Sequence, residues 1–481
     1  MKILKYSLLV IGILFAACAF AQPQAQEYIY GSNTYDVLNA VTRLPDGSFI
    51  LAGTSPPDGD SWQDVYLEKL NVGGTGTEWT VEFGGWPWDE PYDVIPALDG
   101  GYLVVGATRS GAGTTHEMFA RRINPDGSPD WQHEYGAAGY DAARKVFAHD
   151  GGYTLFGYTR LEKFGRSDFR MLRIDTDGNE LWHADYGGSE DEMCFGAGRA
   201  GDGSFLIAGY THSWESQDQD LYMVHVNADG DMLHEFYEVA DYPYVPRAVI
   251  GESDGFVIAG TMYAHPESEM PSAFLMKVDL DGNIVWRHDY TDGMYAEPRA
   301  LTKTPYGYAL AGFAYNGGQP DGWVRWTNSA GNAGTEWTVG GDGWEEFHAV
   351  ALLGENDLLL VGLSTSTANR ESDFYRVHVG DSLVASPERR TVVEEYRLAD
   401  AWPNPFNSVT RLRFETNRAI ALRIALYDLL GREVLTVAQG FVYAGAHSYL
   451  LTGSTLASGM YLVRAYANGT PVDQKRVVLV K

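Results

Sequence analysis

Cysteine is almost absent from this chain of 481 residues, which contains only Cys18 and Cys194. Cys18 lies in an N-terminal segment that we expect to be removed, so the remaining chain cannot form an intramolecular disulfide. Stability must then come from a packed core, and 45% hydrophobic residues over this length are ample for one. Cys194 stands between Met193 and Phe195, and this apolar setting predicts a buried, unreactive thiol.

Basic residues are also scarce. The chain has 35 lysines and arginines against 64 aspartates and glutamates, and the deficit is uneven: residues 27–398 hold 59 acidic and 24 basic side chains, whereas residues 399–481 hold 5 and 9. A strongly acidic surface repels phosphate groups, so we expect no binding to nucleic acid or to anionic membranes. The acidity is compatible with cations, basic proteins or neutral glycans, or it serves only the solubility of an exported protein.

Motifs of common catalytic and metal sites are missing. The sequence has no G-x-S-x-G nucleophile elbow and no H-E-x-x-H pair. Segments beginning at Asp175 and Asp279 resemble the start of a calcium loop, but neither has the glutamate that such a loop needs at its twelfth position. We therefore expect no metal and no cofactor. The sequence leaves catalytic activity open and favours a protein that is not an enzyme.

The only long apolar run lies at the N-terminus. Lys2 and Lys5 precede the run, which extends from residue 8 to residue 17, and the small-residue triplet Ala19-Phe20-Ala21 follows it. This order is typical of a secretory signal peptide, here residues 1–21. Cys18 offers lipoprotein-type cleavage as a less favoured alternative. After cleavage we expect no transmembrane segment.

A short phrase recurs seven times at intervals of 51 or 52 residues. Its first position is Tyr28, Trp79, Trp131, Trp182, His234, Trp286 and Trp337. A second marker, a glycine, keeps step with it at Gly53, Gly106, Gly157, Gly209, Gly260, Gly312 and Gly362. A period near fifty that is rich in strand-forming residues indicates the blades of a β-propeller.

Each copy contains four short apolar segments separated by Asp-Gly pairs, such as Asp150-Gly151 and Asp177-Gly178. Asp-Gly between apolar runs is typical of tight hairpins, so we predict four-stranded antiparallel blades and an all-β, seven-bladed propeller over residues 27–380. The seventh copy lacks its last segment, and the chain begins with a spare one. We therefore predict that residues 27–31 complete the last blade and close the ring.

An acidic residue stands near the start of the first strand of most copies. The residues at this position are Asp36, Asp89, Asp141, Glu192, Glu297 and Glu346, with Tyr244 as the exception. They could form a cation-attracting ring around the central axis. The favoured interpretation is structural, because a short acidic side chain that accepts backbone N–H bonds in each loop would serve every repeat alike.

Departures from the repeat are better candidates for a ligand site, because scaffold positions obey the period. Aromatic and acidic residues interrupt it in the loops between blades, which we expect to gather on one face. Aromatic faces beside carboxylates suit sugar rings, although these aromatics could also pack between blades. The candidate ligand-binding residues are Trp86, Trp88, Asp89, Tyr244, Tyr295, Trp344 and Glu346.

The repeat ends before a linker that we place at 381–398, and residues 399–481 have a different pattern. Short alternating segments predict a small Ig-like β-sandwich of about seven strands. Its motifs are the turn Pro403-Asn404-Pro405-Phe406-Asn407, a hairpin with Gly431, a strand that begins near Gly459 and a basic end at Lys481. In this order they resemble the C-terminal sorting domain of type IX (Por) secretion system substrates.

The resemblance implies that residues 399–481 are recognised by the type IX secretion machinery of a Gram-negative bacterium, and that the protein is secreted or displayed on the outer-membrane surface. Cleavage of the sorting domain would fall within 381–398. We expect the propeller to be a binding or interaction module for an extracellular glycan or protein. The alternative is a polysaccharide hydrolase or lyase that uses the carboxylates of the rim.

Overall fold

The structure is a computed structural model. It describes residues 24–480 except 33–34, 57–61, 86–87, 110–115, 137–138, 161–165, 214–218, 239–242, 264–270, 292–294, 316–317, 355–356, 367–370, 381–395, 399–400, 402–403, 408, 417–419, 429–430, 443–444 and 454–455. The predicted signal peptide, 1–21, lies outside the described residues. The described residues form two compact units, one from residue 24 to residue 380 and one from residue 396 onward, and every regular element described in them is a β-strand.

The first unit is a ring of four-stranded antiparallel sheets, the blades. Blade 1 contains β2 (Val37–Arg43), β3 (Phe49–Ser55), β4 (Asp64–Leu70) and β5 (Thr77–Phe83). Blade 2 contains β6 (Asp89–Pro96), β7 (Tyr102–Thr108), β8 (Glu117–Ile123) and β9 (Pro129–Tyr135). Blade 3 contains β10 (Ala142–His149), β11 (Gly152–Arg160), β12 (Ser167–Asp175) and β13 (Glu180–Tyr186).

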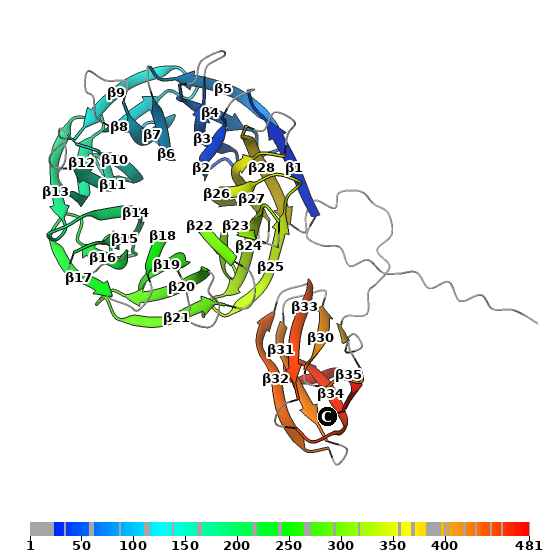
Figure 1. Cartoon of the computed structure of the whole chain (residues 1–481). Coiled ribbons are helices and arrows are strands. Elements are labelled where there is room, and N and C mark those ends of the chain that lie inside the picture. The colour runs from blue at the N-terminus through cyan, green and yellow to red at the C-terminus, as the bar shows by residue number, and fades with distance from the viewer. Residues whose placement is uncertain are drawn as a thin grey trace, which may run out of the picture. The chain divides into compact units, whose positions relative to one another are not determined.

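The same order of strands continues around the ring. Blade 4 contains β14 (Glu192–Arg199), β15 (Phe205–Thr211), β16 (Asp220–Val226) and β17 (Met232–Glu238). Blade 5 contains β18 (Tyr244–Glu252), β19 (Gly255–Met262), β20 (Ser272–Asp279) and β21 (Ile284–Tyr290). Blade 6 contains β22 (Tyr295–Thr304), β23 (Gly307–Tyr315), β24 (Pro320–Asn328) and β25 (Ala333–Val339). In each blade the first strand is innermost and the fourth lies at the circumference (Figure 1).

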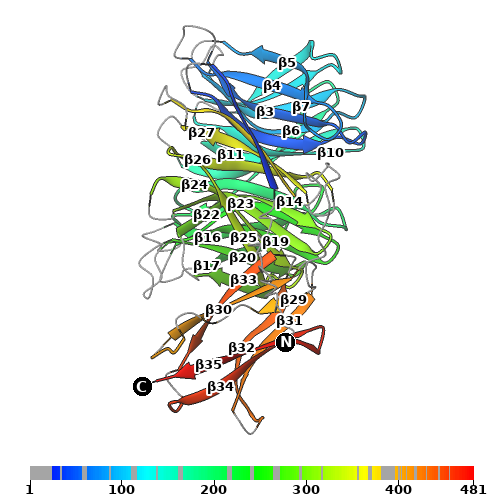
Figure 2. The same ribbon diagram turned by 90° about the vertical axis from the view of Figure 1, so that its right-hand side faces the viewer.

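Blade 7 joins the two ends of the propeller sequence. Its inner strands are β26 (Glu345–Leu352), β27 (Leu358–Ser364) and β28 (Asp373–Gly380), and its outer strand is β1 (Gln24–Tyr30). β1 pairs antiparallel with β28, with Tyr28 opposite Arg376. The missing fourth strand of the last copy is thus supplied from the start of the chain, as the phase of the repeat predicted. Figure 2 shows the same blades after a rotation of 90°.

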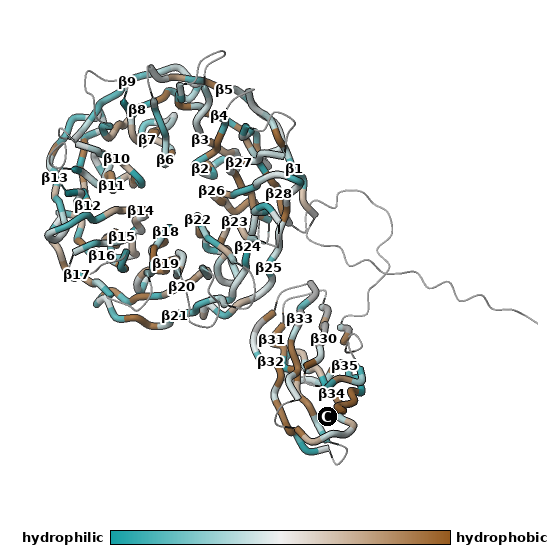
Figure 3. Tube along the Cα trace, in the orientation of Figure 1, coloured by the Kyte–Doolittle hydropathy of each residue, from teal (hydrophilic) through white to brown (hydrophobic). Residues whose placement is uncertain are grey.

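The core lies between the faces of neighbouring blades. The second strands β3 and β7 are buried along their whole length, and most of their residues are apolar. The outer strands alternate between exposed and half-buried positions, as β5 does with the sequence TEWTVEF. Ile50 and Leu67 of blade 1 pack with Val104 and Phe119 of blade 2 in one cluster. Figure 3 shows the resulting alternation of apolar and hydrophilic stretches along the strands.

The second unit contains two sheets, as expected for a small β-sandwich. One sheet has the order β29 (Tyr396–Leu398), β30 (Val409–Thr416), β33 (Gly445–Thr452). The other has the order β32 (Glu433–Val442), β31 (Ile420–Tyr427), β34 (Gly459–Ala467), β35 (Thr470–Leu479). β29 pairs with β30, so the predicted linker 381–398 is too long: residues 396–398 belong to this unit.

The turn motif of the second unit fastens the last strand. Asn404 accepts a hydrogen bond from the Val478 amide at 2.9 Å and donates one to the Arg476 carbonyl at 2.9 Å. Phe406 is buried, and its amide donates to the Val478 carbonyl at 2.9 Å. Pro405 and Asn407 are exposed, while Pro403 and Lys481 lie outside the described residues.

The two motif glycines differ in their local roles. Gly431 has a φ of +78° in the turn between β31 and β32, a conformation that glycine adopts without strain. Gly459 has an ordinary backbone conformation, and a Cβ there would meet only the Tyr461 ring at 3.9 Å, so nothing in the structure requires glycine at this position.

Candidate functional site

The tryptophan of the repeat packs on the next blade. The ring of Trp182 in blade 3 lies against Gly230, in the turn between the third and fourth strands of blade 4; a Cβ on that glycine would be 2.8 Å from the ring. Four residues after the tryptophan, Tyr186 donates a hydrogen bond to the Gly230 carbonyl at 2.7 Å. We call this contact the outer clamp; it comprises the pairs Trp79–Gly127, Trp131–Gly178, Trp182–Gly230 and Trp286–Gly331.

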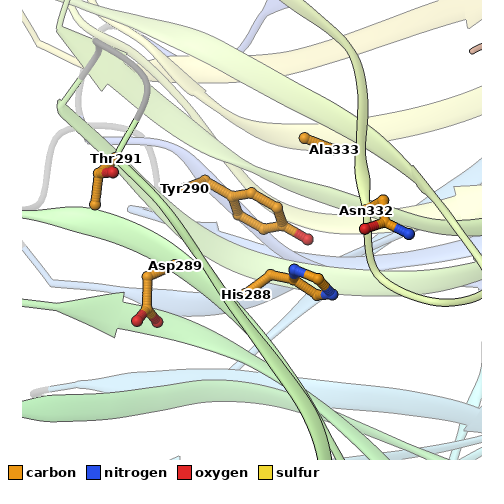
Figure 4. A pocket seen from close by; sticks show the side chains of 6 residues that line it. All are labelled: His288, Asp289, Tyr290, Thr291, Asn332 and Ala333. Carbon is orange, nitrogen blue, oxygen red and sulfur yellow. The ribbon is translucent and has the colours of Figure 1, made fainter. Parts of the chain in front are cut away.

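A pocket of about 280 Å³ lies beside one outer clamp. It is lined by His288, Asp289 and Tyr290 of blade 5 with Asn332 and Ala333 of blade 6 (Figure 4). Tyr290 donates to the Gly331 carbonyl at 2.6 Å, and His288 contacts the Ala330 carbonyl at 2.9 Å. These contacts repeat the scaffold geometry of blade 3, so this pocket is a poor candidate for a functional site.

The second marker of the repeat has a steric reason. Each marker glycine lies on the second strand and pairs with a residue of the innermost strand. Directly after that residue, the pairing register shifts by one. In blade 3, a Cβ on Gly157 would stand 1.8 Å from the Ala142 carbonyl oxygen. The other six marker glycines face the equivalent oxygen at 1.8–2.3 Å. Glycine is therefore needed so that the innermost strand can form a β-bulge at this level.

The bulge gives each innermost strand one extra residue, and these extra residues meet from blade to blade. They are Asn39, Tyr92, Arg144, Phe195, Arg247, Arg299 and His348, which we call the inner ring. His348 Nδ1 lies 2.9 Å from Asn39 Oδ1, and the Arg144 guanidinium stacks 3.8 Å from the centre of the Tyr92 ring. All seven side chains are partly exposed. The inner ring thus uses the same backbone position in every blade, but the side chain at that position varies from blade to blade.

The predicted acidic position needs a correction, because the strand register assigns two of its members elsewhere. Glu297 and Glu346 follow the position by one residue, and Ala296 and Glu345 occupy it instead. Since side chains alternate along a strand, Glu297 and Glu346 point away from the face that holds the other acids. The acids that share the position are Asp36, Asp89, Asp141, Glu192 and Glu345.

These five acids are buried and hold the loops between blades. Glu192 accepts the Gly188 amide at 2.9 Å and the Thr211 hydroxyl at 2.6 Å. Glu345 accepts the Gly341 amide at 2.9 Å and the Ser364 hydroxyl at 2.7 Å. The geometry is that of the structural interpretation, in which carboxylates satisfy loop amides, and it does not expose a ring of charge.

Three of the predicted ligand-binding residues gather around one arginine of the inner ring. Arg299 Nε donates to Glu346 Oε1 at 2.8 Å, and Trp344 Nε1 donates to Glu346 Oε2 at 3.3 Å. The Tyr295 hydroxyl donates to Glu297, which lies 3.9 Å from Arg299. Trp344 is 39% exposed and Tyr295 is half-buried, so this cluster offers aromatic surface beside charge.

The electrostatics of Glu346 follow from its partners. Burial alone would raise the pKa of this carboxyl, but His348, at 3.3 Å, and Arg299 lower it to about 2. Glu346 is therefore ionised at any physiological pH. A carboxylate in this state can hold a cationic or hydroxyl group, and it cannot donate a proton as a general acid near neutral pH.

The remaining predicted residues lie apart. The Trp88 ring stands 4.8 Å from His116, which stacks 3.9 Å from Tyr140, and the three form a second aromatic cluster at the junction of blades 2 and 3. Asp89 is a buried loop acid of the kind described above. Tyr244 is buried against Phe274, with its hydroxyl 3.3 Å from Asp289, so it packs within its blade. Trp86 lies outside the described residues.

Sequence reasoning missed the arginines of the inner ring. Arg144, Arg247 and Arg299 stand 13 residues before the marker glycines Gly157, Gly260 and Gly312. In the other four blades the inner-ring residue stands 14 residues before the marker glycine, so a column of fixed spacing would have mixed the inner ring with strand neighbours such as Ala40 and Ala143. The bulge itself is invisible in sequence, so nothing there indicated that these seven residues meet at the centre.

Other chemistry finds little support in the described part of the chain. Burial raises the pKa of the Cys194 thiol to about 12, which excludes a nucleophilic thiolate at ordinary pH. The residues described hold no group of three histidine, cysteine, aspartate or glutamate side chains that could bind a metal ion. No helix long and apolar enough to span a bilayer occurs within the described ranges.

Known structures resemble the propeller at low sequence identity. A protein of unknown function from Dyadobacter fermentans matches 75% of this chain and all of its own, with 12% identity and a TM-score of 0.42. The β-propeller domain of the Trilobed protease from Pyrococcus furiosus matches 71% and 93%, with 10% identity and a TM-score of 0.42. The polysaccharide lyase Uly1 matches 71% and 89%, with 12% identity and a TM-score of 0.45. No curated protein sequence matches the chain.

A family model accounts for the second unit. Residues 400–480 match the model described as a secretion system C-terminal sorting domain. This agrees with the resemblance carried by the turn motif at Asn404–Asn407 and the hairpin at Gly431. The chain is a seven-bladed β-propeller followed by a type IX secretion system sorting domain, which implies secretion from a Gram-negative bacterium.

Proposed function

We propose that the propeller is an extracellular binding module, carried out of the cell by its sorting domain, that holds a glycan or protein ligand at its inner rim. The observation that carries the proposal is the cluster of Tyr295, Trp344 and Glu346 around Arg299. The cluster departs from the repeat and places the exposed Trp344 indole beside the charged groups of Glu346 and Arg299. Glu192, by contrast, accepts a loop amide and is not described beside an exposed indole. Aromatic faces beside fixed polar groups are typical of carbohydrate sites.

The alternative is an enzyme that cleaves polysaccharide with rim carboxylates. Hydrolysis by an acid–base pair requires one carboxyl that stays protonated near neutral pH. Glu346 is held ionised, with a pKa of about 2, and Glu192 and Glu345 are engaged with loop amides and hydroxyls. These three carboxylates do not supply the protonated acid, and this favours binding over hydrolysis at the site of Glu346.

The test is a screen of the mature full-length protein on a glycan array and against envelope proteins, together with an assay for reducing ends released from polysaccharides. We expect retention of a ligand without its degradation. Trp344→Ala should weaken retention roughly tenfold, the effect expected for loss of a stacking aromatic. The matched control is Tyr237→Ala, which removes an exposed aromatic from the outer strand β17. Release of reducing ends, abolished by Glu346→Gln, would establish the enzyme instead.

We also propose that the protein is displayed on the cell surface or released, after cleavage within 381–395, the part of the expected linker that precedes β29. Deletion of residues 399–481 should leave the propeller inside the cell envelope. Immunoblots of medium, surface and periplasmic fractions check this, and normal export of the truncated chain would contradict a sorting role.

A further inference from the structure

The inner ring is unevenly charged around its circumference. Arg299 is neutralised by Glu346 at 2.8 Å and Glu297 at 3.9 Å. Arg247 belongs to the blade next to that of Arg299, and Arg144 lies two blades further on; among the described residues neither forms an ion pair with a carboxylate. Arg144 and Arg247 therefore carry positive charge without a direct ion-pair partner, although Glu90 and Glu297 lie close enough to act on that charge, in a propeller whose sequence is otherwise strongly acidic.

Aromatic rings, rather than carboxylates, surround these two arginines. Arg144 lies 3.8 Å from the Tyr92 ring centre and 5.8 Å from that of Phe195. Arg247 lies 4.5 Å from the centre of the Phe195 ring, and its only hydrogen bond among the described residues is a long one, 3.4 Å, to the Tyr263 hydroxyl. Stacking on aromatic faces fixes the planes of the guanidinium groups while leaving their edges available to donate.

One donor of each guanidinium group lacks an acceptor, although Arg144 also forms a side-chain hydrogen bond with Tyr158. The Nε atoms of Arg144 and Arg247 are shielded from water and make no hydrogen bond. The nearest carboxylates are already engaged, because Glu90 accepts the Tyr92 hydroxyl at 2.7 Å and Glu297 accepts the Tyr295 and Tyr263 hydroxyls. Burial, together with the neighbouring Arg299, lowers the pKa of Arg247. Since these two Nε atoms are buried, an arriving oxyanion would instead meet the outer N–H groups of the two partly exposed guanidinium groups.

We propose that Arg144 and Arg247 bind the acidic group of a charged sugar, a uronate or a sulfated residue, whose ring stacks on Tyr92 and Phe195. The inference rests on the proposed binding function and specifies its ligand. A guanidinium edge donates two parallel hydrogen bonds to such an oxyanion, and aromatic faces accept the apolar face of a pyranose. The aromatic surroundings favour a sugar over an acidic peptide.

The acidic surface does not prevent this recognition. Charges separated by more than the Debye length, ~8 Å at physiological ionic strength, are largely screened. The two arginines act on a ligand at contact distance, where their own charge determines the attraction more than the distant acidic residues do. Binding should therefore weaken with added salt, since the local ion pairs are screened, and a neutral sugar should show no such dependence.

The experiment is calorimetry on the mature full-length protein with four probes of similar length: an alginate oligosaccharide, its carboxyl-reduced neutral form, a sulfated galactan oligosaccharide and a hexaglutamate peptide. We expect binding of the alginate or the sulfated probe, and the preferred one identifies the acidic group. Arg144→Gln and Arg247→Gln should each weaken it roughly tenfold, as expected for loss of a charge-assisted hydrogen bond.

Two further variants separate recognition from folding. Arg144→Lys keeps the charge without the paired donors and should bind with intermediate affinity if the variant melts like the wild type. Arg287→Gln is the matched control, because Arg287 also stacks on a tyrosine, Tyr244 at 4.7 Å, but lies on the outer strand β21. It should bind normally.

The outcomes distinguish this inference from the proposed function. Equal binding of the neutral probe, or binding unaffected by both glutamine variants, would overturn the inference and leave a binding module. Preference for the peptide would overturn the sugar assignment. Failure of the wild type to bind any glycan or envelope protein would overturn both.

Discussion

The outer clamp and the inner ring lie at opposite edges of the blades and follow the same period, but only the clamp keeps its residue types. Trp182 on Gly230 repeats as Trp131 on Gly178 and as Trp286 on Gly331. In the inner ring the same backbone position holds asparagine, tyrosine, arginine, phenylalanine or histidine. Both depend on glycines. The glycine of the outer clamp leaves room for the tryptophan ring, and the marker glycine leaves room for a carbonyl oxygen of the bulged innermost strand. A repeat can thus hold its backbone constant while it varies the side chains displayed at its centre.

The largest effect should come from breaking the bulge. In Gly157→Val the new Cβ would overlap the Ala142 carbonyl, at 1.8 Å, so the two strands must separate. We expect a loss of about 3 kcal/mol or more in the free energy of unfolding, measured by denaturant titration followed by circular dichroism. Gly318→Ala is the control, because nothing lies within 4 Å of a Cβ there. Equal stability of the two variants would refute the steric account of the marker glycine.

A smaller effect should follow from removing an outer clamp. Trp182→Ala deletes the ring that covers Gly230 and should lower the free energy of unfolding by about 2 kcal/mol, less than for a fully buried tryptophan. His234→Ala provides the comparison at the same repeat position, since His234 comes only within 3.7 Å of a Cβ on Gly282. Its loss should be clearly smaller in the same denaturant titration. Equal losses would mean that the indole is not what joins the blades.

The junction between blades should also respond to pH. Burial, with Glu192 and Asp185 nearby, raises the pKa of Asp168 to about 6. Its favourable contribution is present below the unfolded pKa, about 3.9, and is lost as the pH rises through 6. Asp168→Asn should therefore stabilise the protein at pH 8 by about 1 kcal/mol, allowing for solvent screening, and change little at pH 4. Thermal melts across this range check the sign.

The control for the pH experiment is Asp177→Asn, which changes an exposed aspartate in the neighbouring hairpin of blade 3. Its thermal melts at the same pH values provide the baseline against which the effect of Asp168→Asn is measured. Destabilisation of Asp168→Asn at pH 8 would contradict the raised pKa of Asp168.

The smallest effect should come from the inner ring itself. Arg144→Gln removes a partly exposed cation from the Tyr92 face and should cost only about 0.5 kcal/mol, typical of an exposed cation–π contact. Differential scanning calorimetry beside Trp182→Ala makes the comparison direct. A loss as large as that of Trp182→Ala would make Arg144 part of the scaffold and weaken its assignment to a ligand.

The sequence predicted the fold well because each blade is encoded by one copy of the recurring phrase. The two markers gave the number of blades, the phase of Tyr28 assigned the first strand to the last blade, and the turn motif around Asn404 indicated the sorting domain. The positions of Glu297 and Glu346 were misjudged by one residue. Loops of unequal length hide the register, and only paired strands show which residues share a face.

The candidate site was predictable only in part. Tyr295, Trp344 and Glu346 were recognised as departures from the repeat, and they do lie together. Tyr244 also departed from the repeat, and Asp89 stands directly after the departure at Trp88. Both are nevertheless buried in the scaffold. Glu346 is as buried as they are, so the partners of each side chain, rather than burial, decided between them. Glu346 contacts Arg299 and the exposed Trp344, whereas Tyr244 packs on Phe274 and Asp89 accepts a loop amide.

By itself, the sequence determined the seven blades, their closure by the N-terminal strand and the export domain, because these follow from local patterns repeated along the chain. Only the tertiary structure decided what the glycine marker does and what meets at the centre. Asn39 and His348 are at opposite ends of the propeller sequence and 2.9 Å apart in space. Ring closure brings them together, and the bulge opposite each marker glycine turns seven scattered residues into one surface.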